Sequence, residues 1–428
     1  MKQFLKILFL LLFSIGFAQV SVKEFGAVGD GVTNDTKAIQ KALNAGKPIK
    51  FEQGVYLVDE LTVPYSFKGL SIEGSGYNHW HDNVGTVLKA NKGAASILKF
   101  VDGCDWVKIS NLRLEGGASC SIGINAEYGG SIMLDNIGIY NFTAFGLKSQ
   151  QGLLRINNCF FGNNKVGLQL YSDSTITNTE ISGGSVGLFI RAGGNRVNNI
   201  WINGTTENLI RLEPLNESVG LQNTAFSNIY IGEVKNNTNA EKYQFYIKGN
   251  GIKRVQQVQI SNSFFVHATD TKGSNSFFYL ENADEIIISN NNFLGEHVYS
   301  NRQKFTKNLV KSLNSNNIKI NSNIIKGINE NALVLGSKSY DWSILNNDFI
   351  DCAGQNNINS IIDIQTKDAR TMVLNNRFID YRQNMDVLAL KTVNINSITF
   401  NQNYIYYPNS KIAVDENLNT INLNGNYR

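Results

Sequence analysis

A short pattern, an asparagine between strand-forming residues, recurs along most of the chain and constrains its fold more than any other feature. Its copies include ISNLRL, LDNIGI, VNNIWI and ISNSFF, and thirteen of them follow one another at spacings of 20 to 34 residues, with a mean of about 26. A recurring period of this length indicates a solenoid, in which each repeat packs only against its neighbours. The central asparagines are Asn111, Asn136, Asn158, Asn178, Asn199, Asn228, Asn262, Asn290, Asn321, Asn346, Asn375, Asn401 and Asn424.

The residue types within the copies distinguish between kinds of solenoid. Short β-branched and aromatic segments flank a polar bend, whereas helical repeats would show apolar residues at positions i, i+3 and i+4. Leucine-rich repeats are the nearest alternative, but their leucine consensus and helical segment are missing. Asparagine, at 59 of 428 residues, suits tight bends rather than helix interiors. The sequence therefore predicts an all-β protein, a right-handed single-stranded parallel β-helix of about 13 coils, with the repeat asparagines bonded into a ladder.

The segment before the repeats has a different character, and residues 22–60 are predicted to form an N-terminal cap and the first strands. Residues 22–45, VKEFGAVGDGVTNDTKAIQKALNA, indicate a short strand, a glycine-rich turn and one helix. Thr33, Asn34 or Asp35 could cap that helix. Its apolar face would cover the open end of the stack, where bare strand edges invite aggregation. The residues of that face are Ala38, Ile39, Ala42 and Leu43.

The same segment carries a family resemblance. FGAVGDGVTNDTKAIQKAL, KFEQGVYLV and LSIEGSGYNHWHDNVGTVL resemble the start of the pectate-lyase-like β-helix superfamily, in its rhamnogalacturonase and epimerase-like branch. The specific match covers about 70 residues, and Glu52 stands where this branch usually has proline. The resemblance implies the β-helix fold and a carbohydrate substrate, because the group includes polysaccharide lyases, glycoside hydrolases, sugar epimerases and phage depolymerases. It does not choose a reaction.

No catalytic residue can be transferred from these relatives. The sequence lacks the Asn-Thr-Asp and Gly-His-Gly of polygalacturonase-like hydrolases, the Arg-x-Pro-x-x-Arg of calcium-dependent pectate lyases and the Asp-Pro-His of alginate epimerases. It also lacks a CxxC and any Cys/His metal spacing. We therefore predict no metal site and no cofactor; calcium would be compatible with the fold, but no motif supports it. His79 and His81, with Trp80, lie in a loop predicted to line a groove. Cys159 and Cys352 are predicted to be small core residues, and Cys104 and Cys120 are close enough in sequence to form a disulfide pair.

The first eighteen residues indicate export. MKQFLKILFLLLFSIGFA has a basic start, an apolar run of about eleven residues and a small-residue end, which is typical of a secretory signal peptide; a buried strand or a membrane anchor is the alternative. The predicted division is a signal peptide over residues 1–18 and one β-helix domain over 19–428, with the Asn-centred coils at 100–428. We expect a secreted protein, extracellular, periplasmic or at the cell surface, without a membrane span. A net charge of +4 gives no reason to expect a nucleic-acid partner.

Equivalent positions of successive coils should form columns along the stack. Two residues after the repeat asparagine, side chains are expected to point outward, and sugars dock on exposed aromatic rings. Packing beneath a long loop is the alternative for this column. Its aromatic members, predicted to bind substrate, are Phe160, Trp201, Tyr230 and Phe264. The same spacing adds Arg113, Glu180, Asn292, Asn323, Asp348, Arg377 and Asn403.

A second outward column is expected five residues after the repeat asparagine. Asp351 and Asp380 would lie one coil apart, so the pKa of one should rise, which suits a general acid. Lys326 or His267 could act as a base or neutralise a uronate carboxylate. These four are the predicted catalytic residues, and an ordinary solvated charged column is the alternative. Tyr406 falls in the same column, and Tyr381 and Arg382, just after it, are predicted to bind substrate in the same groove.

Together these features predict a secreted carbohydrate-active protein that binds and cleaves a polysaccharide whose acidity the sequence leaves open. Cleavage by β-elimination is slightly favoured over glycoside hydrolysis, because many lyases share this scaffold. The alternative is a non-catalytic glycan-binding or adhesin-type surface protein.

Overall fold

The computed structural model describes residues 19–414 except 65–68, 237, 239, 268–274, 296–305, 354–359, 383–385, 394–397 and 407–410. The predicted signal peptide and the last repeat asparagine, Asn424, lie outside the described residues. The chain forms two compact units, Met1–Asn164 (unit 1) and Lys165–Arg428 (unit 2).

Unit 1 combines a short 3-10 helix, η1 (Val22–Phe25), one α-helix, α2 (Thr36–Asn44), and a series of strands. One parallel sheet has the order β5-β8-β10-β12, and in the other β9 pairs with β6, β7 and β11, while β11 pairs with β13 and β14. The strands are β1 (Val20–Ser21), β2 (Asp30–Asn34), β3 (Ile49–Lys50), β4 (Gly54–Val58), β5 (Leu61–Val63), β6 (Ser71–Glu73), β7 (Thr86–Ala90), β8 (Ser96–Phe100), β9 (Lys108–Glu115), β10 (Ile122–Ala126), β11 (Met133–Tyr140), β12 (Phe145–Ser149), β13 (Arg155–Asn157) and β14 (Phe160–Gly162).

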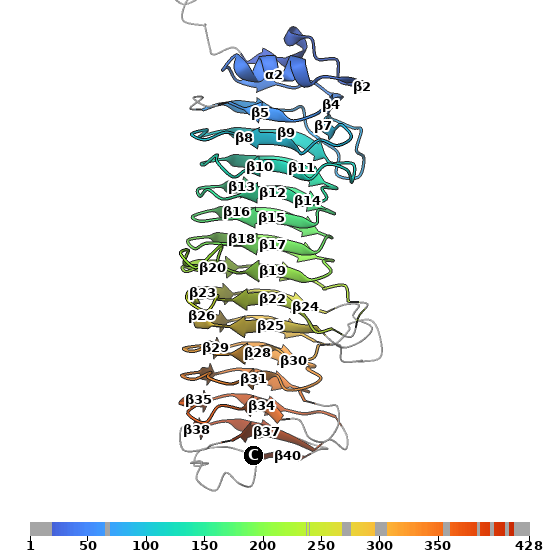
Figure 1. The fold of residues 1–428 in the computed structure, drawn as a ribbon. Helices are drawn as coiled ribbons and strands as arrows, with labels where there is room; N and C mark the ends of the chain where they lie inside the picture. Colours follow the sequence, from blue (N-terminus) through green and yellow to red (C-terminus); the bar gives the residue numbers. More distant parts are fainter. Residues whose placement is uncertain are drawn as a thin grey trace, which may run out of the picture. The chain divides into compact units, whose positions relative to one another are not determined.

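Helix α2 lies at one end of the unit 1 coils, as predicted for a cap (Figure 1). It buries Ile39, Ala42 and Leu43, three of the four residues of the expected apolar face. Asp35 occupies the N-cap position, but its carboxylate accepts the N–H groups of Val28 and Gly29 at 2.7 and 3.0 Å and so closes the glycine-rich turn instead of capping the helix. Within the described part of the chain, no helix is long and apolar enough to cross a membrane.

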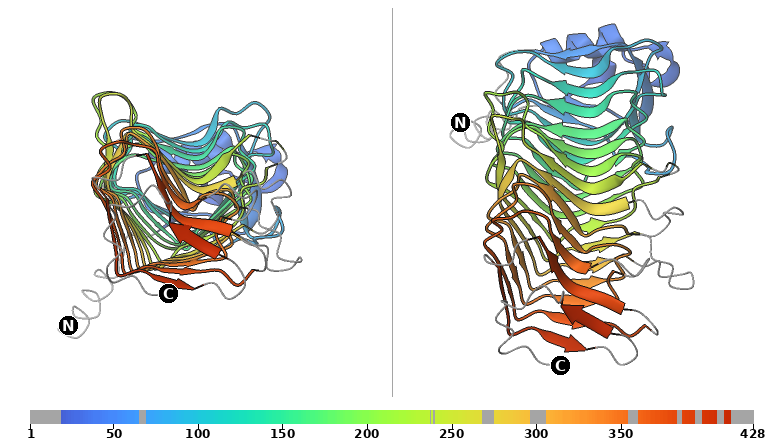
Figure 2. Two further views of the ribbon diagram at one scale, coloured as in Figure 1. Left: turned by 90° about the horizontal axis from the view of Figure 1, so that it is seen from below. Right: turned by 60° about the horizontal axis from the view of Figure 1, so that its bottom comes forward.

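Unit 2 repeats the same coil plan, and its strands stack in register on one another (Figure 2). One parallel sheet runs from β15 through β17, β19, β22, β25, β28, β31, β34 and β37 to β40. The strands are β15 (Val166–Leu170), β16 (Thr175–Ser182), β17 (Val186–Ile190), β18 (Arg196–Asn203), β19 (Asn208–Leu212), β20 (Thr224–Ser227), β21 (Tyr230–Ile231), β22 (Lys242–Lys248), β23 (Val255–Ser261), β24 (Phe264–Val266), β25 (Asn275–Glu281), β26 (Ala283–Ser289), β27 (Asn292–Leu294), β28 (Val310–Leu313), β29 (Lys319–Asn321), β30 (Ile324–Lys326), β31 (Leu333–Leu335), β32 (Ser343–Leu345), β33 (Asp348–Ile350), β34 (Ser360–Ile364), β35 (Thr371–Leu374), β36 (Arg377–Ile379), β37 (Asp386–Thr392), β38 (Ile398–Asn401), β39 (Tyr404–Tyr406) and β40 (Lys411–Val414).

The predicted right-handed parallel β-helix is confirmed, and the strand sets are consistent with about thirteen coils. Each coil buries a layer of Ile, Leu, Val and Phe side chains in its interior. One coil could not bury its own inner face, so the stack is the folding unit. Parallel strands joined by crossovers adopt the right-handed sense almost without exception.

The repeat asparagines make the bends. Ten of the thirteen have a left-handed backbone, with φ between 49° and 58°, which asparagine tolerates better than other side chains. Two coils differ, because the left-handed residue is Ser322 or Gln402 and the aligned asparagine, Asn321 or Asn401, precedes it. In those two coils the predicted bend position is therefore wrong by one residue. This one-residue slip changes which side chains point outward.

The buried asparagine ladder lies one residue after the bend, not at the bend as predicted. In unit 2, Asn347 Oδ1 accepts the backbone N–H of Asn323 at 3.0 Å, and Asn347 Nδ2 donates to Ile320 O at 2.8 Å and to Asn376 Oδ1 at 3.0 Å. The bend asparagines also bond between some neighbouring coils, but near the surface, as Asn199 does to Asn178 at 2.7 Å. The buried ladder consists of Asn291, Asn323, Asn347, Asn376 and Asn403.

All four cysteines are buried free thiols, so Cys104 and Cys120 are not a disulfide pair. Burial raises the pKa of Cys104 to about 11 and that of Cys159 to about 12. All four cysteines therefore fill the core as small apolar residues, the role predicted for Cys159 and Cys352.

Candidate functional site

Three of the predicted aromatic residues form a continuous exposed column in unit 2. Trp201 on β18, Tyr230 on β21 and Phe264 on β24 are direct partners in the parallel ladder. Their exposed fractions are 47%, 39% and 40%. The ring centroids lie 5.3 Å apart for Trp201 and Tyr230, and 5.9 Å apart for Tyr230 and Phe264, whose rings are stacked. The predicted outward orientation of these three residues is confirmed, and we call them the aromatic column.

Further along the same ladder the prediction needs correction. Asn323 and Asn403, expected to point outward, are buried members of the asparagine ladder. The cause is the one-residue slip at Ser322 and Gln402, which turns the expected outward residues inward. The strand register instead continues the column after Phe264 through Asn292, Ile324, Asp348, Arg377 and Tyr404. Asp348 and Arg377 form a surface ion pair, at 3.0 Å.

The second predicted column is also rearranged by this slip. Lys326 and Tyr406 occupy the ladder positions of Ile350 and Ile379, one residue before the two aspartates, so Lys326 does not share their column. The ladder equivalents of Asp351 and Asp380 in the preceding coils are Gly327 and Gly295, whose N–H groups make the same coil-to-coil hydrogen bond. The expected proximity of Lys326 to the aspartates in one column is therefore incorrect.

The structure brings Asp351, Asp380, Tyr381 and Arg382 together, but not as an exposed carboxylate pair. Both aspartates are buried. Asp380 forms an ion pair with Arg382, whose Nε donates at 2.7 Å, and Arg382 Nη2 also donates to Cys352 O at 2.8 Å. Asp351 Oδ1 accepts the N–H of Tyr381 at 2.8 Å. Only the Tyr381 side chain is exposed, so the catalytic role of the two aspartates stays a prediction.

His267 lies inside the coils rather than on an outward column. Its Nδ1 is 2.5 Å from Thr306 Oγ1, and its ring stacks on Phe277 with centroids 4.8 Å apart. Burial lowers its pKa to about 3, so the imidazole is neutral at physiological pH. The expected outward position is wrong because the side chain packs among core rings, where a polymer cannot reach it.

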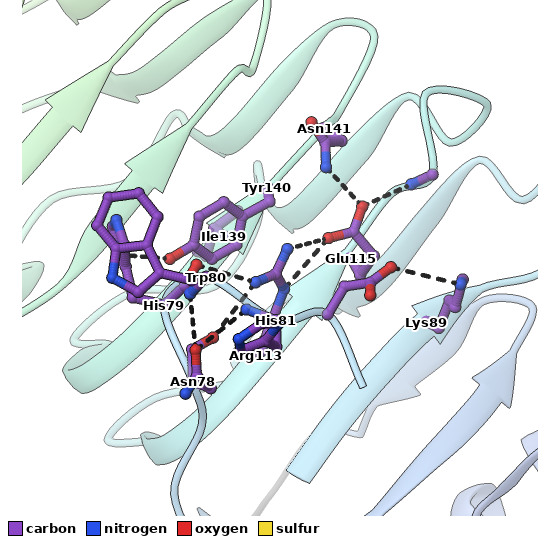
Figure 3. Close-up of polar contacts among 12 residues, drawn as sticks. Asn78, His79, Trp80, His81, Lys89, Arg113, Glu115, Ile139, Tyr140 and Asn141 are labelled. Atoms are coloured by element: carbon purple, nitrogen blue, oxygen red, sulfur yellow. Dashed lines mark hydrogen bonds and ion pairs between the residues drawn. The ribbon is translucent and has the colours of Figure 1, made fainter. Parts of the chain in front are cut away.

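Unit 1 contains a cluster that the repeat alone did not predict. The loop of residues 74–85, which we call the strap, connects β6 to β7 and reaches the outer side chains of β9 and β11 (Figure 3) and the ring of Phe160 on β14. His79 Nδ1 is 3.0 Å from the Tyr140 hydroxyl, and the His79 ring contacts Phe160 and Trp80 edge-on, at 3.9 and 4.4 Å between centroids. Trp80 is 83% exposed. Phe160, predicted as a sugar platform, is thus half-buried under a loop.

A buried ion pair on β9 contacts both the strap and the Tyr140 ring. Arg113 Nη2 donates to Glu115 Oε2 at 2.6 Å, and both residues are buried on β9. The Arg113 guanidinium lies 3.8 Å from the centre of the Tyr140 ring and also donates to the carbonyl oxygens of Asn78 and His79, both at 3.3 Å. A buried charge pair is stable when its remaining hydrogen bonds are satisfied. Arg113 therefore fixes both the strap and the Tyr140 ring.

Glycines make room for the aromatic rings. A Cβ on Gly138 would lie 2.5 Å from the Tyr140 ring and 2.7 Å from that of Tyr77. A Cβ on Gly162 would lie 2.7 Å from both Phe160 and Tyr140. The rings can therefore lie flat against the sheet. Tyr77 is half-buried in this arrangement, and burial raises the pKa of its hydroxyl to about 12.

The cluster has the parts for proton transfer. An imidazole has two ring nitrogens, and a hydrogen bond to one of them fixes the tautomer at the other. When Nδ1–H donates to the Tyr140 oxygen, the Nε2 lone pair of His79 is available as a base. The sequence showed His79 and Trp80 but not their partners, because the docking of one loop follows no repeat. No group of three or more His, Cys, Asp or Glu in the described residues is arranged to hold a metal ion.

Comparisons with known proteins agree with this architecture. The family model for rhamnogalacturonase A/epimerase, pectate lyase-like, matches residues 19–79. A mannuronan C-5 epimerase A-module from Azotobacter vinelandii is 13% identical, covers 96% of this chain and 99% of its own, and superimposes with a TM-score of 0.51. DFA-IIIase from Arthrobacter chlorophenolicus is 13% identical, covering 77% of this chain and 95% of its own with a TM-score of 0.52.

Phage proteins show the same fold. Gene product 12 of bacteriophage phi29 is 15% identical, with a TM-score of 0.55, over 96% of this chain and 59% of its own. The preneck appendage protein of Bacillus phage PZA is 51% identical over 39 residues, which is 9% of this chain and 5% of that protein's length. The whole chain therefore shares the right-handed parallel β-helix fold of these proteins. Its matched segment carries the pattern of the rhamnogalacturonase A/epimerase branch.

Proposed function

We propose that the protein binds a polysaccharide on the aromatic column of unit 2 and cleaves it by β-elimination. The observation that carries the binding proposal is the set of three exposed rings on successive coils, Trp201, Tyr230 and Phe264. Successive coils are about 4.8 Å apart, a spacing close to the length of one sugar ring. Several solved relatives are named as carbohydrate enzymes, which agrees with a glycan substrate.

The chemistry of the column suits sugars. The apolar C–H face of a pyranose packs against an aromatic ring, while its hydroxyls stay in water. A strip of exposed rings on a soluble protein usually marks a contact surface. Because the strip runs along the stack, it fits an extended polymer better than a small molecule.

We place the elimination at His79. In this reaction His79 Nε2 removes the proton next to the uronate carboxyl group, a carbon–carbon double bond forms, and the glycosidic C–O bond breaks as the leaving oxygen takes a proton from water. Tyr140 orients the imidazole through Nδ1, and Arg113 and Glu115 hold Tyr140 in place. The aspartates Asp351 and Asp380 remain the candidates for the competing hydrolytic mechanism, but the ion pair of Asp380 with Arg382 disfavours a role as acid.

A panel of acidic and neutral polysaccharides tests the proposal. Each is incubated with the protein, and products are followed by the ultraviolet absorbance of the new double bond and by reducing ends. Absorbance with reducing ends identifies elimination, and reducing ends alone identify hydrolysis and contradict the proposed reaction.

A non-catalytic glycan-binding protein is the second candidate, favoured by one observation. The aromatic column has a single ionisable ladder neighbour at its start, Glu180 beside Trp201, and the uncharged Asn292 follows Phe264. A surface with so little acid–base chemistry is suited to binding alone. Retention of a polysaccharide without either product would support this candidate over the enzyme.

We further propose that residues 1–18 are removed during export and that residues 19–428 form the mature β-helix protein outside the cytoplasm. The composition of the first eighteen residues supports this. Amino-terminal sequencing of protein recovered from the culture medium or the cell surface should begin at Gln19; retention of Met1 would contradict it.

A further inference from the structure

Unit 2 has a groove on a different face from the aromatic column. Both surfaces are built from the same coils, but the groove is formed by residues before the left-handed bend of each coil and the aromatic column by residues after it. On β18, for example, Arg196 lines the groove, Asn199 makes the bend with φ 50°, and Trp201 belongs to the column. The groove has a volume of about 660 Å³, within the range of ligand-binding clefts.

The floor of the groove is a ladder of outward residues from five strands. Arg196 on β18, Ala225 on β20, Gln259 on β23, Ile287 on β26 and Lys319 on β29 are consecutive partners. The small side chain of Ala225 lies between two long ones, which deepens the floor at that point. The floor therefore alternates apolar and polar contacts, with a cation at each end.

One wall consists of residues at a second left-handed corner. Gln257 and Glu285 have φ values of 55° and 52°, and both side chains are exposed and line the groove. Residues at this corner recur once per coil, so their side chains are spaced by about 4.8 Å. These two coils thus each present a polar side chain along the wall.

Four of the polar side chains that line the groove are not used by the fold, whereas Asn317 Nδ2 donates to Asp284 Oδ1 at 2.8 Å. Gln257, Gln259, Glu285 and Lys319 have no side-chain hydrogen bond or ion pair among the described residues, while Arg196 donates to the carbonyl oxygens of Asn195 and Asn223. On the opposite sheet of unit 2, by contrast, long polar side chains bond one another. Examples are Arg211–Glu213, Lys248–Glu281 and Lys311–Glu241.

We propose that this groove is a second glycan subsite, which binds an uncharged segment of the polysaccharide, separate from the uronate at which the polymer is cleaved. The inference rests on the proposed function, because it assumes that the protein binds glycans. Carboxamides suit sugar hydroxyls, since each offers two donors and an acceptor with two lone pairs. Ala225 and Ile287 supply the apolar floor for the ring faces. The three charged side chains that line the groove, Arg196, Glu285 and Lys319, sum to a single positive charge, whose attraction for an acidic polymer is weakened by solvent and salt.

The experiment fills the groove without touching the core. Ala225→Leu occupies the deepest part of the floor, and Ser343→Leu, in the same ladder one coil beyond Lys319, is the matched control outside the groove. Electrophoresis in gels that contain neutral mannan, xylan or β-glucan, or acidic polygalacturonate or alginate, measures the affinity of each variant. Thermal melting of both variants checks that the fold is retained.

We expect Ala225→Leu to weaken binding of a neutral polysaccharide about tenfold, by occluding the groove, while Ser343→Leu binds as the original protein does. Gln259→Ala should weaken the same binding, because it removes a carboxamide without adding bulk. Unchanged binding of every retained polysaccharide by Ala225→Leu would overturn the second subsite, and an effect confined to acidic polymers would overturn its preference for uncharged sugars. If Trp201→Ala still loses affinity in those cases, the proposed function stands. If the original protein binds no polysaccharide, the proposed function fails, and this inference with it.

Discussion

The candidate sites of the two units are built in different ways. In unit 2 the aromatic column and the groove lined by Arg196 and Lys319 are each built from one ladder position that recurs on successive coils. In unit 1 the cluster around His79 arises where one non-repeating strap docks on β9 and β11. A repeated surface presents the same group at regular intervals, which suits binding of a polymer. Chemistry needs a unique arrangement, and here only a departure from the repeat supplies one.

The buried residue that follows each left-handed bend also differs between the two units. In unit 1 the residue after the bend is apolar, as in Leu112 and Ile137, and both are fully buried. In the later coils of unit 2 the same position is an asparagine whose amide bonds the coils before and after it, as in Asn347. An apolar residue contributes burial alone, whereas a ladder asparagine also satisfies buried backbone groups. The two solutions should respond differently to substitution.

The largest effect is expected from His79→Gln. If the strap carries the chemistry, loss of the base should lower turnover about 10²- to 10⁴-fold and leave binding to the aromatic column unchanged. The control is His81→Gln on the same strap, because the His81 side chain is exposed and makes no hydrogen bond among the described residues. Initial rates on the polysaccharide that the protein cleaves provide the measurement.

The aspartates of unit 2 are the competing catalytic site, and they predict the opposite result. Full turnover in His79→Gln together with loss of turnover in Asp380→Asn would move the chemistry to unit 2, and the contrast between a repeated binding surface and a unique reactive site would fail. Because Asp380 is bonded to Arg382, the melting temperature of Asp380→Asn must be measured alongside its activity.

The next effect is on stability. Asn347→Leu should lower the free energy of unfolding by about 2–6 kcal/mol, because the N–H of Asn323 and the carbonyl of Ile320 lose their partners and each buried orphan costs about 1–3 kcal/mol. Asn346→Gly is the matched control one residue earlier, since glycine adopts the left-handed backbone of that bend. Urea denaturation measures both. Equal losses in the two variants would show that the buried position is no different from the bend.

The fold could be predicted from the sequence because each copy of the repeat contains the residues that cause its bend and its strands. Each bend asparagine marks a left-handed corner, and the strand-forming residues around it alternate inward and outward. The ladder was assigned one residue too early because pairs such as Asn346 and Asn347 look alike in sequence, and only the backbone shows which one turns inward. Ser322 broke the pattern with no asparagine at the bend, and the columns shifted there.

The candidate sites were predictable only where they follow the repeat. Trp201, Tyr230 and Phe264 share one offset, so a count along the sequence was enough to bring them together. His79 and Tyr140 are 61 residues apart and meet because the strap docks on the sheet. No period relates these positions, so no pattern in one sequence could pair them.

Acid should destabilise the fold through His267. Burial lowers its pKa from 6.5 to about 3, so between those pH values the unfolded chain binds a proton that the folded chain does not. Stability from this group is therefore full above pH 6.5 and is lost as the pH falls, by about 1.4 kcal/mol per pH unit. His267→Gln, which keeps a polar group for Thr306, should show a flatter pH dependence of the urea midpoint. Unlike the histidine, the ladder amides cannot titrate, so Asn347→Leu should leave the slope unchanged.

The smallest effect is expected on the aromatic column. Trp201→Ala should weaken polysaccharide binding by about 1 kcal/mol, roughly fivefold in Kd, because one of three aromatic platforms is removed while Tyr230 and Phe264 remain. Trp106→Ala, which removes a similarly exposed tryptophan from unit 1, is the control. If binding is spread over the repeat, Tyr230→Ala and Phe264→Ala should each lose a similar amount, and the double variant Trp201→Ala/Phe264→Ala should lose about the sum. Calorimetry with an oligosaccharide long enough to span three coils measures this. A single residue that carries nearly all the affinity would show that unit 2, like unit 1, relies on one unique contact.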